Sequence, residues 1–145
     1  MDDPNVKTLN EVLKGEFMAI HAYDDVVDKV SDTNLKDELY RMQQIHQENT
    51  LRLSDRIVQL GGRPDGSNGI GGFMADAMLM IETSMNKNPQ YIIEKLKEGS
   101  DKGINATLEV IKGDLDQTSA SIVKDILDRD RNNVTRLESL SRLYQ

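Results

Sequence analysis

The feature that most constrains this chain is a run of residues near its N-terminus that recur four and three positions apart. The run consists of Leu9, Leu13, Glu16, Ile20, Tyr23, Val27 and Val30. This spacing places the side chains along one face of a helix, as in the buried seam of a helical bundle. Glu16 is the exception, because a carboxylate lies where the seam should be apolar.

Two later segments repeat the pattern and also interrupt it. In the segment RMQQIHQENTLRL, residues 41–53, a seam counted back from Leu53 passes through Asn49, His46 and Met42. Near the C-terminus the seam consists of Val123, Ile126, Asp130, Asn133, Leu137, Leu140 and Tyr144. Polar side chains therefore replace apolar ones at two successive seam positions in each of these expected helices.

Cap and stop signals divide the chain into four long helices. They are Asp3-Pro4, the turn at residues 31–34, Gly61-Gly62, Asn88-Pro89, Gly113 and Asp116. Short turns make each successive pair of helices antiparallel, whereas residues 61–88 are long enough to run back along the bundle and to include a short helix at residues 73–85. The sequence predicts an all-α, antiparallel four-helix bundle, a single domain over residues 1–145. Low aromatic (4%) and high charged (30%) content suits this class.

Composition excludes several kinds of function. A formal net charge of −7 argues against nucleic acid, because phosphate binding needs clustered Lys and Arg. The absence of cysteine excludes disulfides, thiol nucleophiles and iron–sulfur clusters. No apolar run approaches the length that spans a membrane, and the acidic start is unlike a signal peptide. We expect a cytoplasmic protein that forms a homo-oligomer, a dimer, through a helix face.

The two halves of the chain resemble each other. A shift of 84 residues places Gly15 on Gly99, Ala22 on Ala106, Asp32 on Asp116, Asn49 on Asn133 and Arg52 on Arg136. This register predicts a duplicated helical hairpin with pseudo-twofold symmetry. The same shift aligns Ser100 with Glu16 and Asp130 with His46.

The polar interruptions are expected at one height. In an antiparallel pair with a turn near residue 32, Glu16 faces a point between His46 and Asn49. In the second pair, with a turn near residue 115, Ser100 faces Asp130. The prediction is one polar layer inside the apolar bundle, formed by Glu16, His46, Asn49, Ser100, Asp130 and Asn133.

The pattern Glu16-x6-Tyr23 and the polar pairs three apart resemble the ferritin-like superfamily, with rubrerythrins and bacterioferritins as characterised members. The segments LNEVLKGEFMAIHAY and LGGRP also resemble an uncharacterised bacterial branch of it. The resemblance implies a di-iron site built from a lone Glu on each of two helices and Glu-x-x-His on each of the other two. Only Glu16 matches that pattern, so a full di-iron ferroxidase is not expected.

Two interpretations of the layer remain open. In the first, Glu16, His46 and Asp130 bind one divalent metal, iron, manganese or zinc, because carboxylate and imidazole suit these ions. The surrounding polar residues would then be Tyr23, Asn49, Ser100 and Asn133. Iron or oxidative-stress handling follows from the resemblance alone. In the second, no metal binds, and a hydrogen-bond network fixes helix register in a structural or interaction protein.

Overall fold

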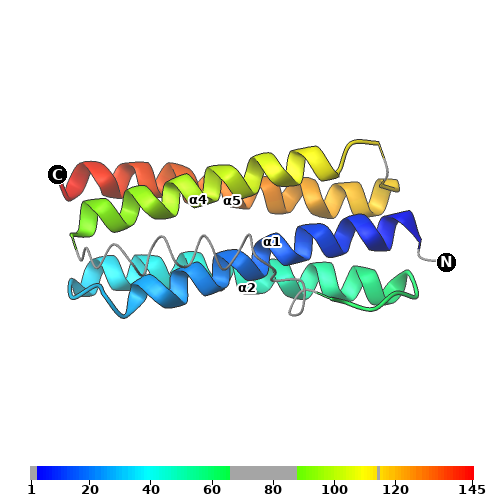
Figure 1. Cartoon of the computed structure of the whole chain (residues 1–145), viewed down its shortest axis with the longest axis horizontal. Coiled ribbons are helices and arrows are strands. Elements are labelled where there is room, and N and C mark those ends of the chain that lie inside the picture. Colours follow the sequence, from blue (N-terminus) through cyan, green and yellow to red (C-terminus); the bar gives the residue numbers. More distant parts are fainter. Residues whose placement is uncertain (1–2, 66–87, 114) are drawn as a thin grey trace.

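The computed structural model describes residues 3–65, 88–113 and 115–145. Four helices account for most of this part of the chain (Figure 1): α1 Pro4–Val27, α2 Thr33–Gln59, α4 Pro89–Val110 and α5 Gln117–Leu143. The described residues contain no β-strand. The predicted all-α class is therefore confirmed, and the four helices pack as a bundle. The short helix expected at residues 73–85 lies outside the described residues.

Each helix begins at a side-chain cap. The Asp3 carboxylate accepts from Asn5 N at 2.8 Å, ahead of Pro4 in the first turn of α1. Asp32, Asn88 and Asp116 are the N-caps of α2, α4 and α5. Because each cap satisfies an amide that lacks an intrahelical partner, the sequence signals for helix starts correspond to actual starts. The expected stop at Gly113 is less accurate, since α4 already ends at Val110.

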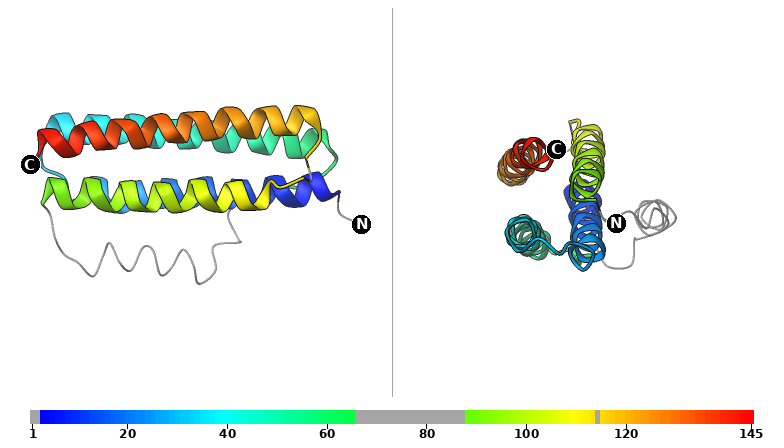
Figure 2. Two further views of the ribbon diagram at one scale, coloured as in Figure 1. Left: turned by 90° about the horizontal axis from the view of Figure 1, so that it is seen from above. Right: turned by 90° about the vertical axis from the view of Figure 1, so that its left-hand side faces the viewer.

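The four helices lie at the corners of a square when the bundle is viewed end on (Figure 2). Helix α1 packs beside α2 and α4, and α5 packs beside α4 and α2. The start of α1 and the C-terminus after α5 lie at opposite ends of the bundle (Figure 1). None of the helices in the described part of the chain combines the length and the apolar character needed to cross a bilayer.

The apolar core consists of two separate clusters. The cluster at one end is formed by Tyr23, Val26, Val27, Val30, Leu35, Leu39, Met42, Ile92, Ile93, Leu96, Leu137 and Leu140. The cluster at the other end is formed by Val6, Leu9, Val12, Leu13, Leu53, Ile57, Val123, Ile126 and Leu127. In sequence, the buried polar residues Glu16, His46, Asn49, Asp130 and Asn133 fall between the two clusters on α1, α2 and α5.

Helix α4 departs from the expected seam. Its buried side chains are confined to its first turns, at Ile92, Ile93 and Leu96. Ser100, predicted to lie inside the layer, is only half-buried, and its hydroxyl donates to the Leu96 carbonyl at 2.7 Å. Ile20 on α1 is likewise half-buried. The C-terminal part of α4 therefore covers α1 incompletely.

Candidate metal centre

Three buried ionisable side chains from three helices meet in the polar layer. Glu16 of α1, His46 of α2 and Asp130 of α5 are 6%, 4% and 8% exposed. His46 Nδ1 lies 3.0 Å from Glu16 Oε1 and 3.5 Å from Asp130 Oδ1. One candidate ligand atom from each residue lies within 4.8 Å of the other two. These are the three residues predicted from the seam interruptions to be metal ligands.

Asn49 connects the two carboxyl groups. Its amide nitrogen donates to Glu16 Oε1 at 2.6 Å and lies 3.3 Å from Asp130 Oδ1. Its amide oxygen accepts from Arg129 Nη1 at 3.0 Å, and Arg129 is held in turn by Glu48 at 2.7 Å. Arg129 thus fixes which way the Asn49 amide points. The sequence reasoning missed Arg129 because it lies beside the seam of α5, and its only signal was its position next to Asp130.

Burial and mutual contact shift the pKa values of the two carboxyl groups in opposite directions. Burial opposes charge on Glu16, but the charge of His46 and hydrogen bonds from His46, Asp130 and Asn49 outweigh it, so the pKa of Glu16 is lowered. Burial, together with the adjacent Glu16 charge, raises the pKa of Asp130 to about 10. Two carboxylates this close cannot both ionise easily without a further cation. Around neutral pH the pair therefore keeps one proton, on Asp130.

Tyr23 lies against the centre through its ring. The ring centroid is 5.6 Å from that of His46. The hydroxyl donates to Met42 Sδ at 3.4 Å, so its single proton is directed away from the carboxyl groups. Burial raises the pKa of Tyr23 above its ordinary value, and Asp130, once it ionises at high pH, adds to this rise. Tyr23 is therefore a neutral neighbour of the centre.

Two polar atoms of the layer are buried without a hydrogen-bond partner. They are His46 Nε2 and Asn133 Nδ2. A buried polar group without a partner is costly, and native proteins leave few of them. The layer is thus incompletely satisfied by the described residues, although His46 Nδ1, Glu16 and Asn49 are well connected.

The donor set fits one divalent metal ion better than two. Two carboxyl oxygens and one imidazole nitrogen suit iron, manganese and zinc. A cation at this point would also relieve the repulsion that keeps Asp130 protonated. Besides Tyr23, the polar residues predicted around the ion are Asn49, Ser100 and Asn133. All three are neutral, and their amide and hydroxyl groups are poor ligands for such ions.

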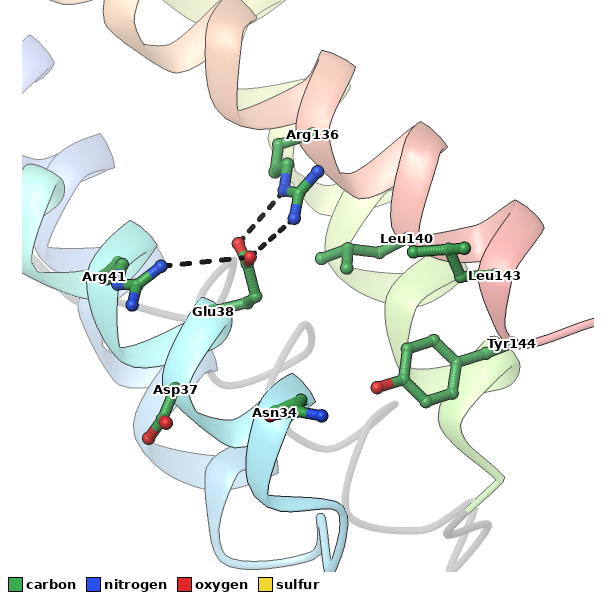
Figure 3. Close-up of a pocket in the computed structure, with 8 residues that line it drawn as sticks. All are labelled: Asn34, Asp37, Glu38, Arg41, Arg136, Leu140, Leu143 and Tyr144. Carbon is green, nitrogen blue, oxygen red and sulfur yellow. Dashed lines mark hydrogen bonds and ion pairs between the residues drawn. The ribbon is translucent and has the colours of Figure 1, made fainter.

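A cavity of about 410 Å³ gives access to this centre from the space between α1 and α4. Glu16, His46, Asp130, Tyr23 and Ser100 all contribute to its lining. A second cavity, of about 420 Å³, lies between the N-terminal part of α2 and the end of α5 (Figure 3). It shares no residue with the centre, and its carboxylate Glu38 is already paired with Arg41 and Arg136.

Comparison with known protein families gives a match over most of the chain. A family described as a domain of unknown function (DUF2383) matches residues 5–113, which is most of the chain. The chain belongs to the DUF2383 family. The DUF2383 match includes Glu16 and His46 but ends before α5, which supplies Asp130. Neither the curated proteins nor the solved structures contain a match to this chain.

Proposed function

We propose that this protein is a ferritin-like bundle that binds one divalent metal ion, iron, manganese or zinc, through Glu16, His46 and Asp130. The observation that carries the proposal is that three candidate ligand atoms, from three different helices, lie within 4.8 Å of one another in a buried layer. Ligands on separate helices fix the ion by tertiary packing, so the site depends on the folded bundle.

The residues around the ligands would have separate tasks. Asn49 orients both carboxyl groups, and Arg129 orients Asn49. Glu16 accepts from His46 Nδ1 in the metal-free protein, so the ion would either replace that contact at Nδ1 or bind Nε2, which has no partner among the described residues. Asp130 must release its proton before it can act as a ligand. A bound ion would supply Lewis-acid chemistry, and redox chemistry if it is iron or manganese.

A role in iron or oxidative-stress handling is the extension of this proposal that the resemblance to ferritin-like proteins suggests. A full di-iron ferroxidase is not supported by the residues present. Ser100 stands where a second lone Glu would be needed, and Asn49 and Asn133 replace the histidines of a Glu-x-x-His pattern. The site that we propose is therefore mononuclear.

Elemental analysis after loading tests the proposal. Protein purified without affinity metal would be loaded separately with iron(II), manganese(II) and zinc(II), desalted, and analysed by mass spectrometry. We expect about one ion per chain for at least one metal, and its loss in Glu16→Ala and in His46→Ala. His21→Ala, which removes the other histidine of the chain, is the matched control and should keep the ion. No retained ion under any loading would reject the proposal, and two ions per chain would reject a mononuclear site.

A metal-free structural or interaction bundle is the second candidate. It is favoured by the direct contacts of His46 and Asn49 with Glu16, which connect the layer without an ion. For a network that only fixes helix register, apolar replacement of both charged partners should stabilise the fold. Glu16→Leu combined with His46→Leu should then raise the melting temperature. A large fall in that temperature would count against this candidate.

A further inference from the structure

Helix α2 carries large apolar side chains on the side that points away from the bundle core. Tyr40, Leu51 and Val58 are 50%, 66% and 60% exposed in the described structure. At about 100° per residue, these three side chains and the exposed Gln47 project within about 40° of one another around the helix axis. They form an outer face of α2, opposite in character to the charged surface that a solvated helix normally presents.

The equivalent face of α5 is polar. The shift of 84 residues pairs the four residues of the α2 outer face with four exposed residues of α5. In the same order, these are Lys124, Arg131, Thr135 and Arg142. The two helices occupy comparable corners of the bundle, so position alone does not explain the difference. Apolar side chains gathered on one face indicate an interaction surface.

One charge of each sign lies beside this face. Arg41 follows Tyr40, and its side chain is 73% exposed and 4.0 Å from Glu38, at the limit of an ion pair. Asp55 is exposed and has no ion pair within the described residues. The two residues are separated by about four helical turns, so they lie along the same edge of the outer face. The edge is therefore positive near one end of the face and negative near the other.

We propose that the outer face of α2 packs against the same face of a second copy of this chain, with the two helices antiparallel about a twofold axis. A register that places Tyr40 opposite Val58 of the second copy also places Gln47 opposite Leu51. It brings Arg41 beside Asp55 of the second copy, and the symmetry makes each contact twice. A parallel pair would place like charges together instead, so the charges favour the antiparallel dimer.

The chemistry of this face suits other partners less well. A formal net charge of −7, with Glu48 and Asp55 beside the face, opposes binding to nucleic acid or to an anionic membrane surface. Neither of the two cavities described above is lined by Tyr40, Leu51 or Val58, so the face offers a small molecule no enclosed site. A second copy supplies both an apolar stripe and the opposite charges.

The length of the face sets the expected strength of the dimer. From Tyr40 to Val58 the helix is about 27 Å long, at about 1.5 Å per residue. One helix face of this length is small beside the roughly 800 Å² per partner of a standard interface. We therefore expect a reversible dimer with a dissociation constant in the micromolar range. None of its residues belongs to the metal centre, so the dimer does not depend on the proposed metal function.

Sedimentation equilibrium of the untagged full chain, with a chelator present, tests the dimer. Wild type should change from monomer towards dimer between about 1 µM and about 100 µM. Leu51→Lys places a charge in the middle of the face and should weaken the dimer by at least about tenfold. Thr135→Lys, the matched change on α5, should leave it unchanged. Thermal melts establish that each variant folds, and Val58→Lys replaces Leu51→Lys if that variant does not.

Two results of this measurement would overturn the proposal. The first is a wild type that stays monomeric throughout, as it would if another partner or another part of the chain covered the face. The second is a dimer that is unaffected by the folded lysine variant of the α2 face.

Mixing two charge variants tests the antiparallel register. Arg41→Glu and Asp55→Arg alone should each weaken the dimer by at least about tenfold, because like charges then meet at both symmetry-related contacts. An equal mixture of the two variants should regain the wild-type affinity, since every contact then joins opposite charges. Asp128→Arg, a matched reversal on the exposed face of α5, should dimerise as wild type does. A mixture as weak as its two components would rule out this pairing.

Discussion

Asn49 and Asn133 follow His46 and Asp130 at the same spacing, yet their hydrogen bonds differ. Asn49 contacts Glu16, Asp130 and Arg129 through both ends of its amide. Asn133 is also buried, but its Nδ2 has no partner among the residues that the structure describes. Two asparagines at equivalent seam positions therefore differ in how much they contribute to stability, because different side chains surround them.

Replacing each asparagine with leucine should separate these roles. Asn49→Leu removes a buried donor from Glu16 and an acceptor from Arg129, which keep His46 and Glu48 as partners, and should lower the free energy of unfolding by about 1–3 kcal/mol. Asn133→Leu removes an unsatisfied amide, so the change should be smaller than about 1 kcal/mol or stabilising. Urea denaturation of metal-free protein measures both. Equal losses in the two variants would show that the Asn49 contacts are not specific.

The protonated state of Asp130 gives the stability a characteristic pH dependence. The folded pKa of about 10 lies far above the ordinary value of 3.8, so between these values the folded chain holds a proton that the unfolded chain has lost. Stability from this group is present at low pH and decreases as pH rises. Asp130→Asn removes that dependence, because the amide is neutral throughout. The melting temperature of this variant relative to wild type should therefore increase between about pH 5 and about pH 9, in the presence of a chelator.

Glu16→Gln provides the opposite case for comparison. The lowered pKa of Glu16 means that its contribution is present above the unfolded value of 4.5 and lost as pH falls. This variant should be less stable than wild type at neutral pH, and the difference should shrink in acid. If Asp130→Asn and Glu16→Gln showed the same trend with pH, the assignment of the shared proton to Asp130 would be wrong.

At the scale of the helices, glycine has opposite roles in α2 and α4. Helix α2 ends in a Schellman motif, in which Gly62 N donates to Ile57 O at 2.9 Å and Gly61 adopts a φ of 81°. A Cβ on Gly62 would lie 2.6 and 2.7 Å from the two methyl groups of Val6. The glycines of α4 have open space instead. The end of α2 thus needs glycine to approach α1, and α4 does not.

The same substitution should consequently have opposite effects in the two places. Gly99→Ala and Gly103→Ala should each raise the free energy of unfolding by about 0.4–1 kcal/mol, because alanine restricts the unfolded chain. Gly62→Ala should lower it by about 1–3 kcal/mol, since the added methyl group overlaps Val6. Thermal and urea denaturation measure these changes. A stabilising Gly62→Ala would mean that α1 and α2 can separate at this end without cost.

The seam spacing predicted the helices and much of the polar layer. Glu16, His46, Asn49, Asp130 and Asn133 are all buried, since an antiparallel hairpin with a known turn fixes which residues share a level. Ser100 was placed less well, because its depth depends on how far α4 stands from α1. Side-chain periodicity carries no information about that distance. The cavity between α1 and α4 and the contact of Arg129 with Asn49 likewise arise from packing between helices.

Across the whole molecule, arginine–carboxylate pairs connect α2 with α5. The pairs are Arg136 with Glu38, Arg129 with Glu48, Arg52 with Asp125 and Arg56 with Asp116. Figure 3 shows the first of them, with both Arg136 and Arg41 directed at Glu38 beside the cavity at this end of the bundle. One side of the bundle is therefore cross-linked by ion pairs, whereas the α1–α4 side contains the cavity that leads to the metal centre.

These pairs should differ in their effect on stability. The Arg56 side chain is 16% exposed, and it also donates to Ser119 Oγ at 3.0 Å and to the N-cap of α5, Asp116. The Arg52 side chain is 40% exposed, and its one ion pair within the described residues is with Asp125. Arg56→Ala should cost about 1–2 kcal/mol, because the buried Ser119 hydroxyl loses the Arg56 donor and Asp116 loses its ion pair while keeping its capping bond to Ser119 N. Arg52→Ala should cost less than about 0.5 kcal/mol, as an exposed pair. Equal losses in urea denaturation would contradict this ranking.

Acid should weaken the ion pairs between α2 and α5. Hydrogen bonds from Arg136 lower the pKa of Glu38, and the backbone bond from Ser119 lowers the pKa of Asp116. Their contribution is therefore present above the unfolded pKa values of 4.5 and 3.8 and is lost as pH falls through the lower folded values. The melting temperature should fall steeply below about pH 4, and this fall should be shallower in a Glu38→Gln variant, which has already lost one of the two groups. An acid transition that is identical in Glu38→Gln would show that the acid-sensitive contacts lie elsewhere.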